Sequence, residues 1–257
     1  MTQRPIPLPP SVNYHLWQPC NMRCRFCFAA FDDVKASVLP KGHLPEPQAA
    51  LVVERLSERF EKITFAGGEP TLCPWLWGLM ERARRSGAIT MLVTNGSMID
   101  DAWLYRYAGV LDWLTLSVDS AVPETNARMG RAVSGRAIAA GRYREMASGA
   151  RARGIRVKVN TVVTSHNHGE DMRAFIRDLA PERWKVLQAL PVATSPLPLT
   201  GSGALAADGL CRNGSLVEGH VGRGGAAPLT LSCSAGQAAS TYAHFLANSR
   251  GLPNEWS

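Results

Sequence analysis

The amino-acid sequence predicts an α/β fold, an open, partial barrel of six parallel strands that alternate with helices. Two observations in the first 190 residues predict it. Short apolar runs, rich in β-branched and aromatic residues, are bounded by Gly, Asn, Asp or Pro. Stretches in which apolar residues recur every three or four positions separate these runs. Eight such units would close a barrel, so six predict an open one, with functional loops at the carboxyl ends of its strands.

The six predicted strands are the apolar runs themselves, taken in chain order. Strand–helix–strand units join parallel strands by right-handed crossovers, so strands that follow one another in the sequence are expected to be neighbours in the sheet. We place the strands at 12–17, 62–65, 90–93, 113–118, 156–163 and 184–190.

The five predicted helices lie between these strands. In the first helix, Leu51, Leu56 and Phe60 recur at helical spacing. Pro47 suits a first helical turn, and Gly87 and Gly154 suit helix ends. We place the helices at 47–60, 74–86, 100–107, 137–153 and 169–179.

The composition changes near residue 191. We divide the chain into an N-terminal extension (1–10), the barrel (11–190) and a Gly- and Ala-rich tail (191–257). The tail holds six charged residues, against 43 in the first 190. It shows no sustained period, which predicts little regular structure. Two interpretations stay open: a loose accessory tail, or a stretch that does not follow the native reading frame.

The chain is basic, with a net charge of +7 from 28 basic and 21 acidic residues. All of the excess lies in the first 190 residues, which favours anionic partners such as nucleotides, nucleic acid or acidic lipid. No run approaches the ~20 apolar residues that span a bilayer. The proline-rich start lacks the apolar segment of a secretory signal, so we expect a cytoplasmic protein that does not bind membranes.

Three of the six cysteines, Cys20, Cys24 and Cys27, form a C-x3-C-x2-C cluster directly after the first predicted strand. Three thiolates on one loop can bind three irons of a [4Fe–4S] cluster, which leaves the fourth iron open to a small chelating molecule. Zinc is an alternative, but it needs a fourth ligand, for which His15 is the nearby candidate. We favour the iron–sulfur cluster over zinc and over plain buried cysteines, and expect the other three cysteines to be ordinary small side chains.

A second motif follows the second predicted strand, with the sequence AGGEP at 66–70. Gly67 and Gly68 allow the backbone to approach a ligand closely. Glu69, or the backbone beside it, can accept hydrogen bonds from an ammonium group. A plain turn would also explain two glycines, and the position one β/α unit after the cysteines is what favours a site.

Charged residues alternate within two neighbouring predicted strands. Lys158 and Asn160 lie on one strand, and Arg183 and Lys185 lie on the next. Residues two apart on a strand face the same side, so these strands direct four polar groups, three of them cationic, into one space. Solvated strand ends with snorkelling side chains are the alternative. Charged pairs inside apolar strands favour a binding site.

The cysteine spacing, with Phe26 before the last cysteine, and the AGGEP sequence resemble the radical S-adenosylmethionine (SAM) superfamily. The resemblance implies a partial barrel in which SAM chelates the open iron, and one electron from the cluster then cleaves SAM to methionine and a 5′-deoxyadenosyl radical. It places Phe26 beside the adenine. The remaining residues that it implies for SAM binding are Gly67, Gly68, Glu69, Thr94, Asn95, Ser117 and Asp119. Turn and capping roles are nearly as consistent with the last four.

Further segments resemble viperin and its prokaryotic relatives. They are SVNYH at 11–15, SVLP at 37–40, EKI at 61–63, NGS at 95–97, SVDS at 117–120, GR at 130–131, KVN at 158–160 and RWKVLQ at 183–188. The resemblance covers about 11–190. It implies conversion of a nucleoside triphosphate, CTP in the best-known members, to its 3′-deoxy-3′,4′-didehydro form, a chain terminator in antiviral defence.

Carried over position by position, the viperin resemblance implies a set of substrate contacts. The residues implied to hold the phosphates are Lys62, Arg131, Lys158, Arg183 and Lys185. Asn160 would contact the substrate, and Lys158 is also our candidate general acid for the departing 3′ hydroxyl. These residues grip phosphate and ribose, so they carry no preference among the bases.

The resemblance also implies partners and alternatives. We expect a flavodoxin or ferredoxin as electron donor, a monomer, and no direct binding of nucleic acid. The chain does not align with the C-terminal region of the family after residue 190. Two other functions therefore stay open: another radical SAM enzyme that acts on a peptide or small metabolite, and an inactive, truncated relative that binds a cluster.

Overall fold

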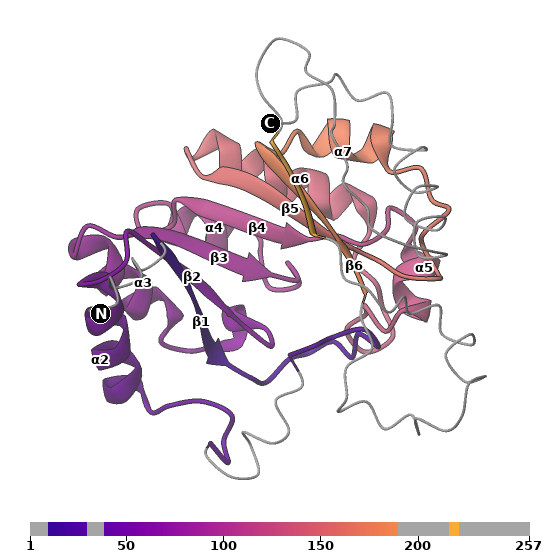
Figure 1. Cartoon of the computed structure of the whole chain (residues 1–257). Coiled ribbons are helices and arrows are strands. Elements are labelled where there is room, and N and C mark those ends of the chain that lie inside the picture. The colour runs from indigo at the N-terminus through magenta and orange to yellow at the C-terminus, as the bar shows by residue number, and fades with distance from the viewer. Residues whose placement is uncertain (1–9, 30–38, 190–215, 221–257) are drawn as a thin grey trace, which may run out of the picture.

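The computed structural model describes residues 10–29, 39–189 and 216–220, which form one curved sheet with helices packed on one face (Figure 1). Six strands are parallel and follow the order of the sequence. These strands are β1 (Ser11–Trp17), β2 (Lys62–Gly67), β3 (Ile89–Thr94), β4 (Trp113–Ser117), β5 (Arg156–Val163) and β6 (Arg183–Gln188). A further strand, β7 (Leu216–His220), pairs antiparallel with β6.

Helices connect the parallel strands. They are α2 (Glu46–Ser57), the 3-10 turn η1 (Pro70–Leu72), α3 (Leu76–Arg85), α4 (Asp101–Tyr107), α5 (Pro123–Arg128), α6 (Ala140–Ala152) and α7 (Arg173–Leu179). The Asp100 carboxylate accepts a hydrogen bond from the Trp103 N–H and so caps α4. Gly87 and Gly154 follow α3 and α6 with φ of +84° and +74°, the left-handed conformation that ends many helices.

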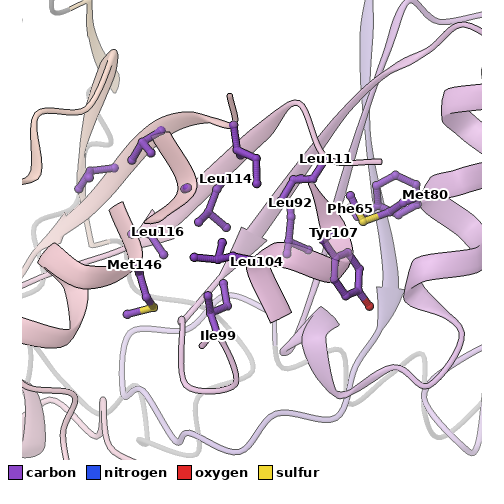
Figure 2. Packing of buried hydrophobic residues seen from close by; sticks show 14 of the residues in the cluster. Phe65, Met80, Leu92, Ile99, Leu104, Tyr107, Leu111, Leu114, Leu116 and Met146 are labelled. Atoms are coloured by element: carbon purple, nitrogen blue, oxygen red, sulfur yellow. The ribbon is translucent and has the colours of Figure 1, made fainter. Parts of the chain in front are cut away.

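The hydrophobic core lies between the sheet and these helices. Leu92, Leu114 and Leu116 project from the middle strands toward Leu104 of α4 and Met146 of α6 (Figure 2). All five are almost fully buried. Because alternate strand residues point to opposite faces, the residues between them point away from the helices.

We call this second side of the sheet the inner face. It is polar where the helix-packed side is apolar, and several of its residues are nonetheless buried, including Thr115 and Lys158. The polar inner-face residues are Asn13, His15, Lys62, Thr64, Thr115, Ser117, Lys158, Asn160, Arg183 and Lys185. The curved sheet thus presents its polar residues to one space.

The structure confirms the predicted fold class, with each of the six strands and five helices within a few residues of its expected bounds. The prediction missed α5, η1 and β7. The helix α5 has Pro123 and Ala127 but no large apolar residue, so it carries no helical pattern. The division at residue 191 stays a prediction, because apart from β7 the tail lies outside the described residues. Among the described helices, none has the length and apolar character needed to cross a membrane.

Candidate active site

The three clustered cysteines lie on the loop that follows β1. The loop is anchored to the segment after α5, because the Arg23 N–H donates to the Gly130 carbonyl at 3.1 Å and the Arg25 N–H donates to the Met129 carbonyl at 3.0 Å. Gly130 has a φ of +76°, and a Cβ there would lie 2.0 Å from the Arg23 carbonyl oxygen. Glycine at this position therefore permits the contact that holds the loop.

The thiols of this loop differ in their surroundings. Cys20 and Cys24 are partly buried and Cys27 is exposed. Burial raises the pKa of the Cys24 thiol to about 11, although the Arg131 guanidinium acts in the opposite direction. Burial also raises the pKa of Cys20, and the charges of Cys27 and Glu69 add to the effect. Without a bound metal these two thiols are therefore protonated at neutral pH.

The AGGEP segment packs directly on the start of the cysteine loop. A Cβ on Gly67 would lie 2.1 Å from the Trp17 carbonyl oxygen, and one on Gly68 would lie 2.0 Å from that of Gln18. The Gly68 N–H donates to the carbonyl of Trp17 at 2.6 Å, and the Glu69 N–H donates to the carbonyl of Pro19 at 3.0 Å. Both glycines therefore allow two backbones to meet, a reason for the motif that the sequence analysis did not foresee.

Glu69 links the ends of β2 and β3. Its fully buried carboxylate accepts hydrogen bonds from the Thr71 N–H (3.0 Å) and hydroxyl (2.6 Å), the Thr94 hydroxyl (2.7 Å) and the Asn95 N–H (2.7 Å). Burial raises the pKa of Glu69, and these four donors oppose the rise. Since protein donors surround the carboxylate, the backbone beside Glu69 is the better candidate to bind an ammonium group.

Asn95 extends this network to the cysteine loop. Its amide donates to the Asn21 side-chain oxygen at 2.9 Å, and Asn21 in turn donates to the Ser97 hydroxyl at 2.9 Å. A cavity of about 510 Å³ lies beside this contact. The residues that line it are Asn21, Ser97, Met98, Val133, Ser134, Arg136 and Ile138.

A buried ion pair contacts the cysteine loop at Cys24. The Arg131 guanidinium contacts the Asp119 carboxylate at 2.9 Å, and both side chains are almost completely buried. Arg131 also donates to the Ser117 carbonyl at 2.7 Å and to the Cys24 sulfur at 3.7 Å. Asp119 accepts a further hydrogen bond from the Val162 N–H at 2.7 Å. The pair therefore ties the ends of β4 and β5 to the cysteine loop.

Six polar residues form two rows on the inner face, across β4, β5 and β6. The strand register aligns them as Thr115–Lys158–Arg183 and Ser117–Asn160–Lys185. Neighbouring strands lie ~4.8 Å apart and alternate residues ~7 Å apart, so the six side chains share a small patch. The Thr115 hydroxyl and the Asn160 side-chain oxygen are buried and have no hydrogen-bond partner among the described residues.

Lys62 lies on the same face but nearer the amino ends of the strands. It pairs with Ile89 in the register of β2 and β3, four residue positions below the row of Lys158. This offset corresponds to about 13 Å along the strands. Lys62 also lies three strands from Lys158, which adds ~14 Å across the sheet, so the two cations face the common space from opposite sides.

A comparison with known families decides which family this chain belongs to. The family described as the Radical SAM superfamily matches residues 16–179, the stretch from β1 through α7. The chain belongs to this superfamily. Its cysteine loop and AGGEP segment both lie within the matched stretch.

Curated relatives narrow the comparison. The "S-adenosylmethionine-dependent nucleotide dehydratase" of Flammeovirga pacifica is 50% identical over 184 residues, which cover 71% of this chain and 63% of the relative. The protein of the same name from Lacinutrix mariniflava is 49% identical over 185 residues, covering 71% of this chain and 39% of the relative. The chain thus spans less than two thirds of these relatives. Their name confirms the predicted viperin-type resemblance.

Solved structures support the fold. The structure described as "Native anSMEcpe with bound AdoMet" is 20% identical and has a TM-score of 0.57. The matched part covers 70% of this chain and 51% of the solved chain. At this identity the likeness shows a shared radical SAM fold.

Radical SAM proteins use a [4Fe–4S] cluster and SAM, and the residues of this chain fit the cluster. Cys20, Cys24 and Cys27 offer three soft sulfur ligands from one loop, the donor type that iron–sulfur clusters take. Within the described residues, no three Cys, His, Asp or Glu side chains, the three cysteines included, are grouped closely enough to hold a metal ion, so the fit rests on the donor type and the shared loop. His15 lies on the inner face with its ring against Phe28 (6.2 Å between centroids).

The roles predicted for the SAM-binding residues stay predictions, but the structure shows where these residues lie. Phe26 is partly buried within the cysteine loop. Thr94, Asn95, Ser117 and Asp119 lie at or just after the carboxyl ends of β3 and β4, where the loop is anchored.

Some polar residues of the site escaped the sequence analysis. Asn21 lies inside the cysteine motif but was given no role, and its link to Asn95 depends on a contact 74 residues apart. Thr115 could have been found, because it lies two residues before Ser117 on the same strand and so shares its face. Of the other cysteines, Cys73 is buried in the core as expected, and Cys211 and Cys233 lie outside the described residues.

Proposed function

We propose that this chain is a radical SAM nucleotide dehydratase that converts a nucleoside triphosphate, CTP before others, to its 3′-deoxy-3′,4′-didehydro form in antiviral defence. The observation that carries the proposal is the alignment of Lys158 with Arg183 and of Asn160 with Lys185 on the inner face. A triphosphate carries about four negative charges and needs several fixed cations. The names of the curated relatives support the reaction class.

The position of each cation on the sheet indicates which part of the triphosphate it would contact. Arg183 and Lys185 lie on β6 beside Lys158 on β5 and would grip phosphate oxygens, Arg with two donors and Lys as a point charge. Lys62, about 13 Å further along the strands, would hold the terminal phosphate. The Arg131 guanidinium already has Asp119, Ser117 and Cys24 as partners, so its phosphate contact is the least supported member of the set.

The ribose would lie between these cations and the cysteine loop. Bound cluster and SAM would supply a carbon radical that takes the hydrogen atom from C4′ of the ribose. Asn160 would hold the ribose through its buried side-chain oxygen, which lacks a partner among the described residues. Lys158 would give a proton to the 3′ oxygen, so that the hydroxyl leaves as water. One further electron from outside completes the product.

The remaining assignments follow from this arrangement. The carbonyls beside Glu69 would accept from the SAM ammonium group, and Phe26 would pack on the adenine. Thr94, Asn95, Ser117 and Asp119 would complete the SAM side. We further propose a monomer in the cytoplasm that receives its electrons from a flavodoxin or ferredoxin and that binds no nucleic acid directly.

The test is a search for the product nucleotide. Anaerobic protein with iron and sulfide restored is given SAM, reductant and CTP, and mass spectrometry measures any nucleotide lighter than CTP by one water. Lys158→Met is expected to lower the yield by about 100-fold, as for loss of a general acid. Arg183→Gln is expected to raise KM by about tenfold or more, whereas exposed Arg59→Gln changes neither. Equal yields from all four proteins would contradict the proposal.

A further inference from the structure

The surface around the cysteine loop carries arginines that form no ion pair with any carboxylate in the part of the chain that the structure describes. We define the arginine rim as Arg23, Arg25, Arg128 and Arg136. All four are exposed, and among the described residues none forms an ion pair. The Arg23 guanidinium donates to the carbonyls of Cys20 and Met22, neutral acceptors that leave its charge in place.

This absence of carboxylate partners differs from most of the described surface. Nine other arginines there form ion pairs with Asp or Glu side chains. They are Arg55, Arg82, Arg84, Arg85, Arg142, Arg144, Arg153, Arg156 and Arg173. Three further exposed arginines lack an ion pair among the described residues, but each belongs to the helix layer: Arg59, just after α2, Arg106, on α4, and Arg177, on α7.

Backbone hydrogen bonds and a shared cavity bring the rim together from segments about 100 residues apart in sequence. The backbone bonds from Arg23 and Arg25 to residues 129–130 place both beside Arg128. Arg136 lines the same 510 Å³ cavity as Asn21 of the cysteine loop. The rim therefore lies on and beside the loop that holds the cluster ligands.

Two large apolar side chains of the cysteine loop and the adjoining cavity are also exposed. Phe28, directly after the exposed Cys27, is 68% exposed, and Met98 at the cavity is 49% exposed. Aromatic residues, Met and Arg are the residue types enriched in protein interfaces. Among the described residues, this surface thus combines exposed apolar side chains with positive charge that no ion pair offsets.

We propose that the arginine rim, with Phe28 and Met98, is the docking surface for an acidic one-electron carrier protein that reduces the cluster. No bond forms or breaks in this step: the carrier loses one electron, and the cluster gains it and goes from the 2+ to the 1+ state. Electrostatic steering by such a rim raises the rate of encounter. The proposal depends on the cluster of the superfamily and is independent of the nucleotide substrate.

The test measures how fast the cluster is reduced. Anaerobic protein with its cluster restored is mixed in a stopped-flow instrument with a reduced flavodoxin that has an acidic surface around its flavin. The variant Arg128→Glu/Arg136→Glu leaves the cysteine loop unchanged, and Arg59→Glu/Arg106→Glu makes the same charge change elsewhere. Photoreduced deazaflavin, a small reductant that needs no docking surface, reports on the cluster itself. Rates are divided by the cluster content of each sample.

We expect the rim variant to slow reduction by flavodoxin about tenfold or more at low ionic strength. The rim variant's rate of reduction by deazaflavin should change less than about twofold, and so should the control variant's rate of reduction by flavodoxin. Added salt should slow the reduction of the unaltered protein by flavodoxin. Equal losses in both variants, an equal loss with deazaflavin, or no salt dependence would overturn the proposal. A rim variant that keeps its flavodoxin rate but loses affinity for single-stranded RNA would overturn it too. None of these measurements needs a nucleoside triphosphate. Failure of this proposal can therefore be distinguished from failure of the proposed dehydratase function.

Discussion

At the scale of single residues, the site depends on charged groups that are buried and paired. The Arg131–Asp119 pair is the clearest case, because both side chains are almost wholly out of water and each also bonds to a strand end. Isolated charges are very unfavourable at such positions, so removal of one partner leaves the other uncompensated. The sequence showed both residues in motifs, but nothing in it showed that they pair.

The pair predicts a large loss of stability on substitution. Asp119→Ala should lower the free energy of unfolding by about 3–5 kcal/mol, because it leaves the Arg131 charge buried without a partner. Urea denaturation of the cluster-free protein measures this. In the exposed Arg144–Asp178 pair, Asp178→Ala should cost less than about 1 kcal/mol. Similar losses in both variants would show that the buried pair is not the anchor that the structure indicates.

At the scale of elements, the alternation of apolar and polar residues predicted which strand residues face the helices and which face away from them. The alternation in β5 and β6 predicted that Lys158, Asn160, Arg183 and Lys185 share a face, and the register confirms it. The pairing of the loop with residues 129–130 was beyond such reasoning, because it depends on backbone contacts between distant segments. The same holds for α5, which lacks an apolar stripe.

The contact between the AGGEP segment and the cysteine loop gives an element-scale prediction. Gly68→Ala should separate the two segments, because its Cβ would lie 2.0 Å from the Gln18 carbonyl oxygen. We expect iron content after reconstitution to fall at least about twofold and stability to drop by about 1–3 kcal/mol, as in overpacked sites. Gly78→Ala, within α3 and with no atom within 4 Å of the new Cβ, should keep its iron and gain about 0.5–1 kcal/mol. Full iron content in Gly68→Ala would contradict this account.

At the scale of the whole molecule, the excess positive charge of the first 190 residues has two locations. One is the inner face, where cations from β2, β5 and β6 point into a common space. The other is the arginine rim around the cysteine loop. A parallel sheet places the carboxyl ends of its strands at one edge, so the motifs gather there despite their separation in sequence. Charge alone predicted an anionic partner, and the fold divides cationic side chains between two separate surfaces, for each of which we propose one.

The most direct test of the central claim is the amount of 5′-deoxyadenosine that the anaerobic, reconstituted protein forms from SAM in the presence of each nucleoside triphosphate. We predict a burst that depends on a triphosphate, because the inner-face cations position such a substrate for loss of its C4′ hydrogen. The burst should be largest with CTP, the substrate that the resemblance to viperin implies. Slow formation at the same rate with every triphosphate and with none would contradict the claim, since it would show a working SAM site without a nucleotide substrate.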